Sequence, residues 1–442
     1  MKYLLCIALV FTTAFQVYSG DSIWTMDKCM RYAIDNSPKV KKAYYQEDSY
    51  KADKLAAFGS FLPSISSGVE AQYNYGRSID PKTNTYNNTS TFGNSYALRA
   101  SMTVFSGGRL INQWKLAKVN GLYGREVSRQ AEDELAINTM QAYIDVVFYY
   151  ESTKLAHETL EESKKLLHKT IRMEELGLKG KADVAQVESQ VAADDYNLTR
   201  QQNLYNIALL TLKEYMNYDS SLPLPLDTTI VSVNYITFSE PADAIYAYAA
   251  TNNPLTQQAA LTLQADKLQQ RIEKSRLLPS ISFYSGVSTT YFENLKADTS
   301  TPFNSQFRNN AGEYFGFSMS FTLFDRLSRT ASMRKAKNNI SISAEQQNET
   351  LRQLQVSIEK AVSDRDGYLK EIIQMKKQVE ANSIVYHQSV RKFEEGLMSS
   401  LDLQINSNKL VESKMFLLQR KLLYIAKVRQ VSYYSGESLI QE

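Results

Sequence analysis

The chain has 442 residues, of which 50 are basic and 47 acidic, so its formal net charge is only +3. Because charges of both signs are interspersed, the composition argues against a nucleic-acid-binding surface. Tyrosine is frequent, with 29 residues, and part of it clusters in segments that alternate like β-strands.

The N-terminal segment 1–20 predicts a secretory signal peptide. One cation, Lys2, precedes an apolar run from Tyr3 to Phe15, and small residues follow. This run is too short to span a bilayer, and no later stretch approaches ~20 apolar residues. We therefore expect an exported chain without a transmembrane helix. Cys29 then remains as a helix-packing residue rather than a reactive thiol.

An internal repeat organises the rest of the sequence. Segments 36–66 and 252–282 both end in LPSIS, and Pro38 and Pro254 near their starts are 216 positions apart. Spacing that is kept over a whole segment in this way indicates a duplication rather than a chance match.

A second pair of blocks has a slightly different offset. ELGLKGKADV at 175–184 corresponds to EEGLMSSLDL at 394–403, which lies 219 positions later. The difference of three residues must therefore fall between the blocks. The duplication predicts two similar units joined by a linker, with bounds at 21–218, 219–240 and 241–442.

Each unit is expected to begin with one helix, at roughly 25–59 and 241–276. These helices end at a leucine–proline step, because proline disfavours the helical conformation in the residue before it. A β-hairpin, a very long helix, a glycine-bearing tip and a last helix follow in both units. The hairpins are expected at about 64–105 and 280–324, and the tips at 177–182 and 396–401.

The predicted strands carry apolar side chains on one face and polar ones on the other, least cleanly in the third. About ten residues with this alternation fit a tilted transmembrane strand, whereas a half-buried sheet of a soluble domain is the alternative. The segments that join them, 76–95 and 293–312, are polar and are expected to be exposed loops. The strands are expected at 65–75, 96–104, 281–291 and 315–323.

The long helices show coiled-coil periodicity. From Arg109 to Leu176 a continuous helix would be roughly 100 Å long, too long to be buried in one compact domain. It must therefore pack sideways against neighbours of similar length. After each tip, apolar residues recur at every seventh position: Val184, Val191, Leu198, Tyr205 and Leu212 in the first unit, and Leu403, Leu410, Leu417, Tyr424 and Val431 in the second.

Four strands per chain cannot close a barrel, and open sheet edges are not tolerated in lipid. We therefore expect several copies to contribute four strands each to one shared barrel. Three copies would give twelve strands above a ring of twelve helices, although the pattern alone does not choose three over two or four.

With these elements in this order, the chain resembles the TolC-like outer-membrane efflux proteins. The resemblance rests on the two LPSIS blocks, the strand that ends in FSGGR, the long helices and the tips followed by aspartate. It implies a mainly α-helical fold with membrane β-strands. The assembly would be a trimer with a twelve-stranded β-barrel in the outer membrane of a Gram-negative bacterium and a twelve-helix α-barrel in the periplasm.

The same resemblance implies a passive exit duct that opens at its periplasmic end. Its partners would be outer-membrane lipid, a periplasmic adaptor and an inner-membrane pump of the RND or ABC type. The alternative is a non-transporting coiled-coil tether of the cell envelope.

Two sets of tip residues take roles from this resemblance. One set would dock the adaptor, although a plain helical turn also explains its glycines. The other would form the periplasmic entrance. The docking residues would be Gly177, Leu178, Lys179 and Gly180 in the first tip, and Gly396, Leu397, Ser399 and Ser400 in the second. The entrance residues would be Asp183, Phe393, Met398, Asp402 and Ile405.

Within the entrance set, Asp402 matches the first of two acids that form a ring in the family, and Ile405 stands in place of the second. Phe393 and Met398 stand where the best-known member has an aromatic hydroxyl and an arginine. Because their side chains cannot form polar links, the resemblance implies closure by apolar packing, or a looser closure. Asp183 and Asp402 also suit the first turn of a helix, where a negative charge is favourable.

Residues that could support enzyme chemistry are not gathered in recognisable motifs. His157, His168 and His387 lack metal-ligand spacing, and no catalytic motif is found. The adjacent acids Asp194 and Asp195 are interpreted as solvated charges on a helix. We expect neither enzymatic activity nor a cofactor, and no bound metal.

Overall fold

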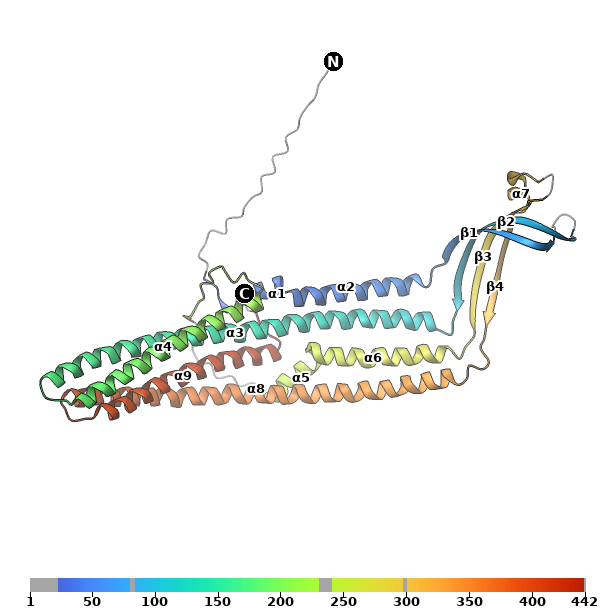
Figure 1. The fold of residues 1–442 in the computed structure, drawn as a ribbon. Coiled ribbons are helices and arrows are strands. Elements are labelled where there is room, and N and C mark those ends of the chain that lie inside the picture. Colours follow the sequence, from blue (N-terminus) through green and yellow to red (C-terminus); the bar gives the residue numbers. More distant parts are fainter. Residues whose placement is uncertain (1–22, 80–83, 230–240, 297–299, 441–442) are drawn as a thin grey trace, which may run out of the picture.

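The computed structural model describes residues 23–79, 84–229, 241–296 and 300–440. It shows a long array of helices with a curved sheet at one end (Figure 1). The predicted signal peptide and residues 230–240 of the predicted linker lie outside the described residues. The elements are α1 (Met26–Asn36), α2 (Pro38–Gly59), β1 (Ser64–Ile79), β2 (Tyr86–Phe105), α3 (Arg109–Glu175), α4 (Lys181–Met216), α5 (Ala242–Asn252), α6 (Pro254–Ser275), β3 (Ser280–Asn294), α7 (Phe303–Asn309), β4 (Gly312–Ser320), α8 (Ser328–Glu394) and α9 (Ser400–Tyr434).

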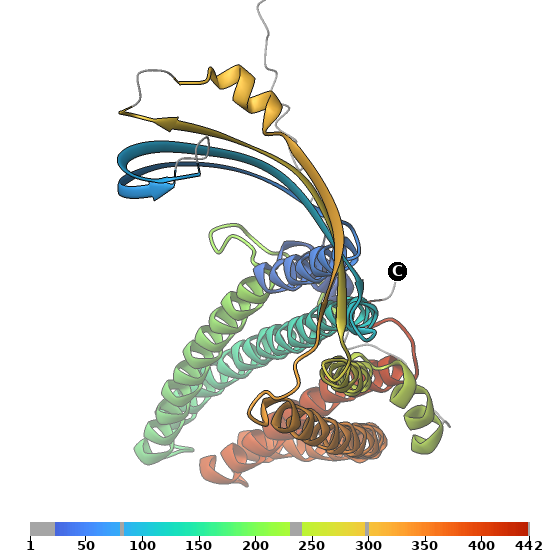
Figure 2. The same cartoon turned by 90° about the vertical axis from the view of Figure 1, so that its right-hand side faces the viewer.

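The predicted fold class is confirmed. The helices α3 and α8 each have 67 residues, which corresponds to roughly 100 Å of continuous helix. They pack sideways, α3 against α4, α2 and α6, and α8 against α9 and α6 (Figures 1 and 2). The heptad residues of α4 and α9 are all buried or half-buried, so the coiled-coil prediction is also confirmed. Among the described residues, no helix combines the length and the apolarity needed to cross a bilayer.

The prediction of one continuous helix at the start of each unit is wrong. Ser37 and Asn253 are extended, with ψ angles of 126° and 133°, and they separate α1 from α2 and α5 from α6. Each residue precedes a proline, which disfavours the helical conformation there. The side chains of both residues then cap the next helix, since each accepts a hydrogen bond from the backbone N–H two positions on, at 3.1 Å for Ser37 and 3.0 Å for Asn253.

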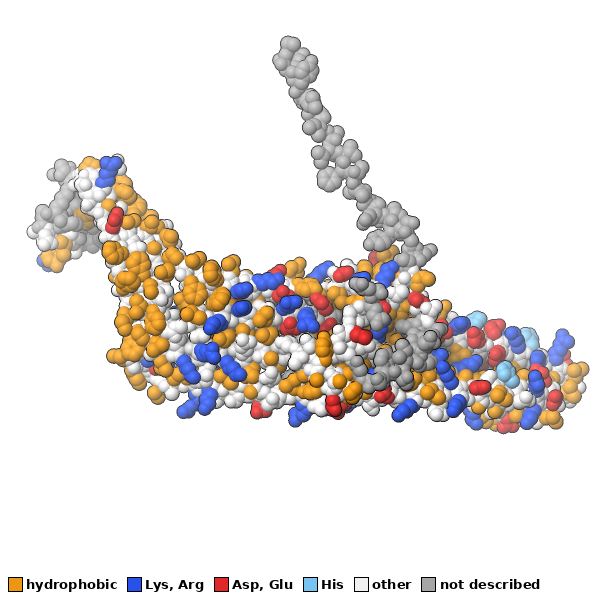
Figure 3. Space-filling view, turned by 180° about the vertical axis from the view of Figure 1, so that it is seen from behind, with side chains coloured by type: hydrophobic (Ala, Val, Ile, Leu, Met, Phe, Trp, Pro, Cys, Tyr) orange, Lys and Arg blue, Asp and Glu red, His pale blue; other side chains and the backbone are white. Residues whose placement is uncertain are grey.

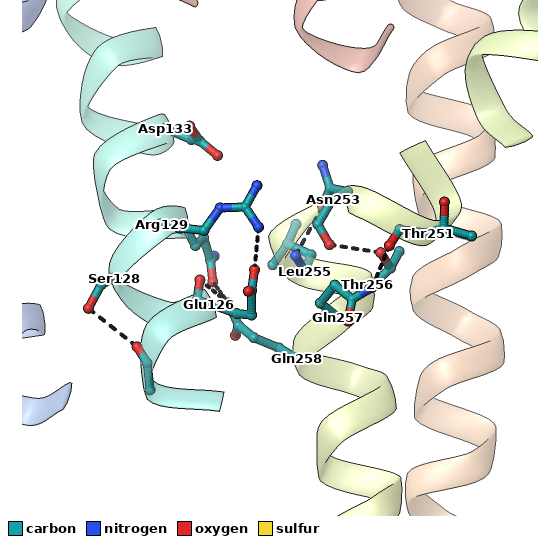
Figure 4. Close-up of polar contacts among 12 residues, drawn as sticks. Glu126, Ser128, Arg129, Asp133, Thr251, Asn253, Leu255, Thr256, Gln257 and Gln258 are labelled. Carbon is teal, nitrogen blue, oxygen red and sulfur yellow. Dashed lines mark hydrogen bonds and ion pairs between the residues drawn. The ribbon is translucent and has the colours of Figure 1, made fainter. Parts of the chain in front are cut away.

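The helix α6, which begins directly after Asn253, lies against α3 (Figure 4). The Gln258 amide on α6 donates to the carbonyl oxygen of Glu126 at 3.0 Å and to Oε1 of Gln130 at 2.8 Å. Glu126 in turn forms an ion pair with Arg129 at 2.7 Å. These contacts join the first unit to the second in the half of α3 that lies nearer the sheet.

The four strands form one antiparallel sheet in the order β1-β2-β3-β4. The two hairpins therefore join through β2 and β3, and β1 and β4 are the edge strands. Apolar residues pair across all three ladders on one face, as Val69 with Tyr96, Leu98 with Val287, and Phe283 with Phe317. Hydrophobic side chains gather over this end of the molecule, whereas charged ones are spread along the helices (Figure 3). The predicted alternation is confirmed.

Several predicted bounds in the sheet are wrong, and the segment 76–95, predicted as an exposed loop, belongs mostly to β1 and β2. The strands β1, β2 and β3 have 16, 20 and 15 residues, more than the ten expected, while β4 ends at Ser320 and leaves 321–323 outside it. The segment 293–312 is not only a loop, because it contains the helix α7. Both hairpins thus reach farther from the helices than the apolar alternation indicated.

The largest apolar core lies where α1, α3, α4 and α9 meet. Cys29 is fully buried there, and burial raises the pKa of its thiol to about 12, so the packing role predicted for Cys29 is confirmed. Tyr143 is 1 % exposed, and its hydroxyl donates to the carbonyl oxygens of Trp24 at 3.1 Å and Asp227 at 2.6 Å. The Tyr143 hydroxyl therefore ties two segments to α3: the one around Trp24, before α1, and the one around Asp227, after α4.

Candidate functional site

The two helical tips lie side by side at the end of the molecule opposite the sheet (Figure 1). Gly177 and Gly396 have φ angles of +72° and +76°, which favour glycine, and each directly follows the last residue of a helical turn. In both tips the N–H of the next residue bonds to the carbonyl oxygen five positions back, Leu178 to Met173 and Leu397 to Lys392, at 2.8 Å each. This is the Schellman arrangement that ends helices at glycine.

Lys179 links the first tip to the second. Its ammonium group donates to the carbonyl oxygen of Met398 at 3.0 Å and lies 4.4 Å from the centre of the Phe393 ring. Phe393 is fully buried, so the cation is held against an aromatic face that water does not reach. The side chains of Phe393 and Met398 form no polar link of their own. The link comes instead from the cation in the opposite tip.

A second link joins Asp183 to Ser400. The Ser400 hydroxyl donates to one carboxylate oxygen at 3.0 Å, and the backbone N–H of Gly180 donates to the other at 3.2 Å. Asp183 thus caps the N-terminus of α4 and binds the other hairpin at the same time. Lys169 and Glu394 form a further ion pair between the two hairpins.

Asp402, the counterpart of Asp183, stays exposed. Its carboxylate accepts a hydrogen bond from Ser399 at 2.7 Å, and its N–H donates back to the same hydroxyl at 3.1 Å. Ile405 is also exposed. The two aspartates occupy equivalent positions in the repeat but different environments. In a single protomer Asp183 connects the two hairpins, whereas Asp402 faces solvent.

The ends of both tips expose leucine side chains. Leu176, Leu178, Leu397 and Leu401 are each more than half exposed, although only Leu178 and Leu397 were assigned from the sequence. Because glycine and serine flank them, the leucines protrude from tips with little other side-chain bulk. These four exposed apolar side chains can bind the apolar groove of a partner helix.

Next to the tips, toward the sheet, a layer of polar side chains lies between the helical hairpins α3–α4 and α8–α9. Gln186 donates to Gln404 at 2.8 Å, Gln404 also contacts Gln190, and Tyr386 donates to Glu162 at 3.0 Å. A cavity of about 30 Å³ lies among these side chains, room for one or two water molecules. This layer places polar groups where a coiled coil usually has apolar ones.

Asp194 lines the same cavity, and its interpretation as a solvated charge is wrong. The residue is 9 % exposed, one carboxylate oxygen accepts from Gln190 at 2.8 Å, and the other has no partner. Burial raises the pKa of this carboxyl group, against the hydrogen bond from Gln190, which lowers it. Asp195, by contrast, is exposed.

We expect Asp194→Asn to increase thermal stability at neutral pH. The pKa of Asp194 is higher in the folded than in the unfolded state, so the folded protein binds the proton more tightly. This contribution to stability is fully present below the unfolded-state pKa of about 3.9 and is lost as the pH rises through the folded-state pKa. Asparagine does not ionise, so its advantage should vanish in acid. Thermal unfolding midpoints of Asp194→Asn and of the unmodified protein, compared from acid to neutral pH, measure the difference, with Asp195→Asn as the matched control. An equal gain for both variants would contradict the role of burial.

Metal chemistry has no support in this region. Over the described ranges, no three side chains of histidine, cysteine, aspartate or glutamate gather closely enough to hold a metal ion. Lys179 and Asp183, two charged residues of the first tip, are used in contacts between the hairpins. What the arrangement can do is hold the two hairpins together at one end or release them.

Comparison with known proteins agrees with this architecture. The model of a family described as outer membrane efflux protein matches residues 30–218 and 245–436, so both repeats are covered. The chain belongs to the outer membrane efflux protein family. No curated protein is similar enough in sequence to match the chain.

Solved structures of three membrane proteins are similar to this chain in fold. CusC superimposes with a TM-score of 0.82 at 16% sequence identity, covering 93% of this chain and 92% of CusC. VceC of Vibrio cholerae gives a TM-score of 0.80 at 14% identity, covering 94% and 96%. The outer membrane channel CmeC of Campylobacter jejuni gives 0.79 at 15% identity, covering 94% and 87%. At such identities the likeness is one of fold.

Proposed function

We propose that this protein is a passive exit duct in the outer membrane of a Gram-negative bacterium. The observation that carries the proposal is the described sheet, whose apolar face is exposed and whose edge strands β1 and β4 are each paired on one side only in one copy. Phe315 and Phe317 on that face are 81 % and 67 % exposed, which suits contact with lipid. A non-transporting tether would need the helices but not such a sheet.

The open edges require several copies in one assembly, which we propose is a homotrimer. Unpaired backbone groups are not tolerated in lipid, so β4 of one copy must pair with β1 of the next. Three copies close a barrel of twelve strands, and their long helices continue it as a tube of twelve through the periplasm. The ring of helices gives the duct its length, and the tips close its far end.

The tips are proposed as the periplasmic end. The exposed leucines would dock a periplasmic adaptor, which connects the duct to an inner-membrane pump of the RND or ABC type. Because the duct holds no energy source, the pump drives transport and the duct only opens. The contacts of Lys179 and Asp183 between the hairpins would hold the entrance closed.

The proposal is tested by fractionation, chemical cross-linking and planar-bilayer recording of the full-length protein. It expects the protein in the outer-membrane fraction, a cross-linked trimer and ion conductance after reconstitution. A monomer in the soluble periplasmic fraction would contradict both the membrane sheet and the trimer. Stable outer-membrane trimers without conductance would favour the tether instead.

Asp402 is expected to attract cations to the entrance. Three copies would place three exposed carboxylates around one axis, and exposed charges add even where each contributes little. Asp402→Ala should therefore raise severalfold the concentration of multivalent cation, added from the periplasmic side, that halves the current. Glu395→Ala removes an exposed charge from the same tip and serves as the control. Unchanged block in Asp402→Ala would remove this residue from the entrance.

A further inference from the structure

The two hairpins differ in how far their strands pair. β1 pairs with β2 along its whole length, from Ser64 to Ile79. β3 pairs with β4 only from Ser280 to Ser288, although it continues to Asn294 beside β2. The outer part of β3 therefore has a strand on one side and none on the other.

The helix α7 occupies that open side. The side-chain amide of Gln306 accepts from the N–H of Phe292 at 3.0 Å and donates to its carbonyl oxygen at 2.9 Å, as a strand residue would. Asn310 donates to the carbonyl oxygen of Thr290 at 2.7 Å. Side chains thus take the place of a strand for both backbone groups of Phe292 and for the carbonyl oxygen of Thr290.

α7 also covers the apolar face of the sheet. The rings of Phe303 and Phe307 lie 6.1 and 5.4 Å from that of Tyr96, and Phe303 lies 5.3 Å from Tyr291. Figure 2 places α7 on the convex side of the curved sheet, at the end away from the helices. Phe303 and Phe307 remain 41 % and 39 % exposed, and Arg308 beside them is exposed too.

These contacts indicate surroundings that are poor in water. In water the free edge of β3 could hydrogen-bond to solvent and would need no amide to satisfy it, whereas in lipid every such group needs a protein partner. The aromatic face of α7 continues the apolar face of the sheet. It lies over the middle strands β2 and β3, while another copy must join at β1 or β4.

We propose that α7 is embedded in the outer boundary of the membrane, with Phe303 and Phe307 among lipid acyl chains and Arg308 at the headgroup phosphates. Aromatic residues at the interface and a cation at headgroup level are the pattern of membrane-boundary anchors. The inference rests on the proposed function, because it requires the sheet to lie in a bilayer. An anionic membrane surface would repel acidic side chains, and α7 contains none.

The test places a nitroxide label on a single introduced cysteine and compares its collisions with oxygen, which enters lipid, and with a water-soluble nickel complex. The variants are Phe307→Cys and Phe303→Cys in α7, with Phe317→Cys on the sheet face and Asn309→Cys at the end of α7 as references. The buried thiol of Cys29, with its pKa raised to about 12, stays unlabelled. Each variant is reconstituted as the full assembly in liposomes.

The proposal expects labels at 303 and 307 to favour oxygen as strongly as the label at 317, and the label at 309 to favour nickel. If 317 favours oxygen while 303 and 307 favour nickel, α7 stands in water and the inference fails, although the duct remains. If 303 and 307 meet neither reagent, another copy covers α7 and the inference also fails. If 317 itself favours nickel, the sheet is not in lipid, and the proposed function falls with it.

Discussion

Replacing Lys179 by methionine is expected to raise the current through the resting duct by at least about tenfold. Methionine keeps an apolar stem near the Phe393 ring but removes the ammonium group that donates to the Met398 carbonyl oxygen at 3.0 Å. A hydrogen bond to a charged group contributes about 1.5–3 kcal/mol, and all copies of the assembly would lose it together. Planar-bilayer recording of the reconstituted protein measures the effect.

Two further variants make this experiment specific. Lys181→Met removes an exposed cation two positions away and should leave the resting current unchanged. Ser400→Ala breaks the other link, to Asp183, and should also increase the current, because this hydrogen bond too involves a charged group. If both Lys179→Met and Ser400→Ala conduct like the unmodified protein, the contacts between the hairpins do not hold the entrance closed.

Much of the fold follows from patterns that local chemistry sets. The alternation in the strands and the heptads of α4 and α9 depend only on which face of an element is buried, and both are predicted correctly. The helix breaks at Ser37 and Asn253 were predictable as well. The rule that ends α2 before Pro63 applies equally to the residues before Pro38 and Pro254, and each is also a good capping residue.

The contacts between the hairpins were not predictable in the same way. Lys179 and Met398 are 219 positions apart, and the acceptor is a backbone carbonyl oxygen, which carries no signal in the sequence. Asp194 and Asp195 are neighbours of the same type, yet one is buried and the other exposed, because only one faces α3 across the coiled coil. Such differences depend on how two hairpins are aligned, which no single segment determines.

The helix α7 depends both on a local sequence pattern and on a contact with a distant segment. Its polar composition predicted a loop, and seven residues are too few for a periodic signal. What stabilises it is the free edge of β3, to which Gln306 and Asn310 supply hydrogen bonds. The one indication in the sequence was the pair Phe303 and Phe307, spaced four apart in an otherwise polar segment.

The largest loss of stability is expected from Tyr143, which fills the core between α1, α3 and α4. Tyr143→Ala would leave a cavity in a fully packed site and should cost about 3–5 kcal/mol. Tyr143→Phe keeps the ring but removes the hydroxyl that donates to the part-buried carbonyl oxygens of Trp24 and Asp227, of which the Trp24 oxygen keeps the Asp227 N–H as a donor. Its cost should be about 1–3 kcal/mol.

The two substitutions separate packing from anchoring. Both should lower the thermal unfolding midpoint, Tyr143→Ala the more, and Tyr143→Phe should in addition speed proteolysis near Trp24 and Asp227, since the hydroxyl ties both segments to α3. Tyr150→Phe is the control, because Tyr150 lies two turns along the same helix and is 43 % exposed. A Tyr143→Phe protein as stable and protease-resistant as Tyr150→Phe would show that packing alone holds these segments. In that case the packing of the apolar core where α1, α3, α4 and α9 meet, rather than the hydrogen bonds of Tyr143, would hold these segments on α3.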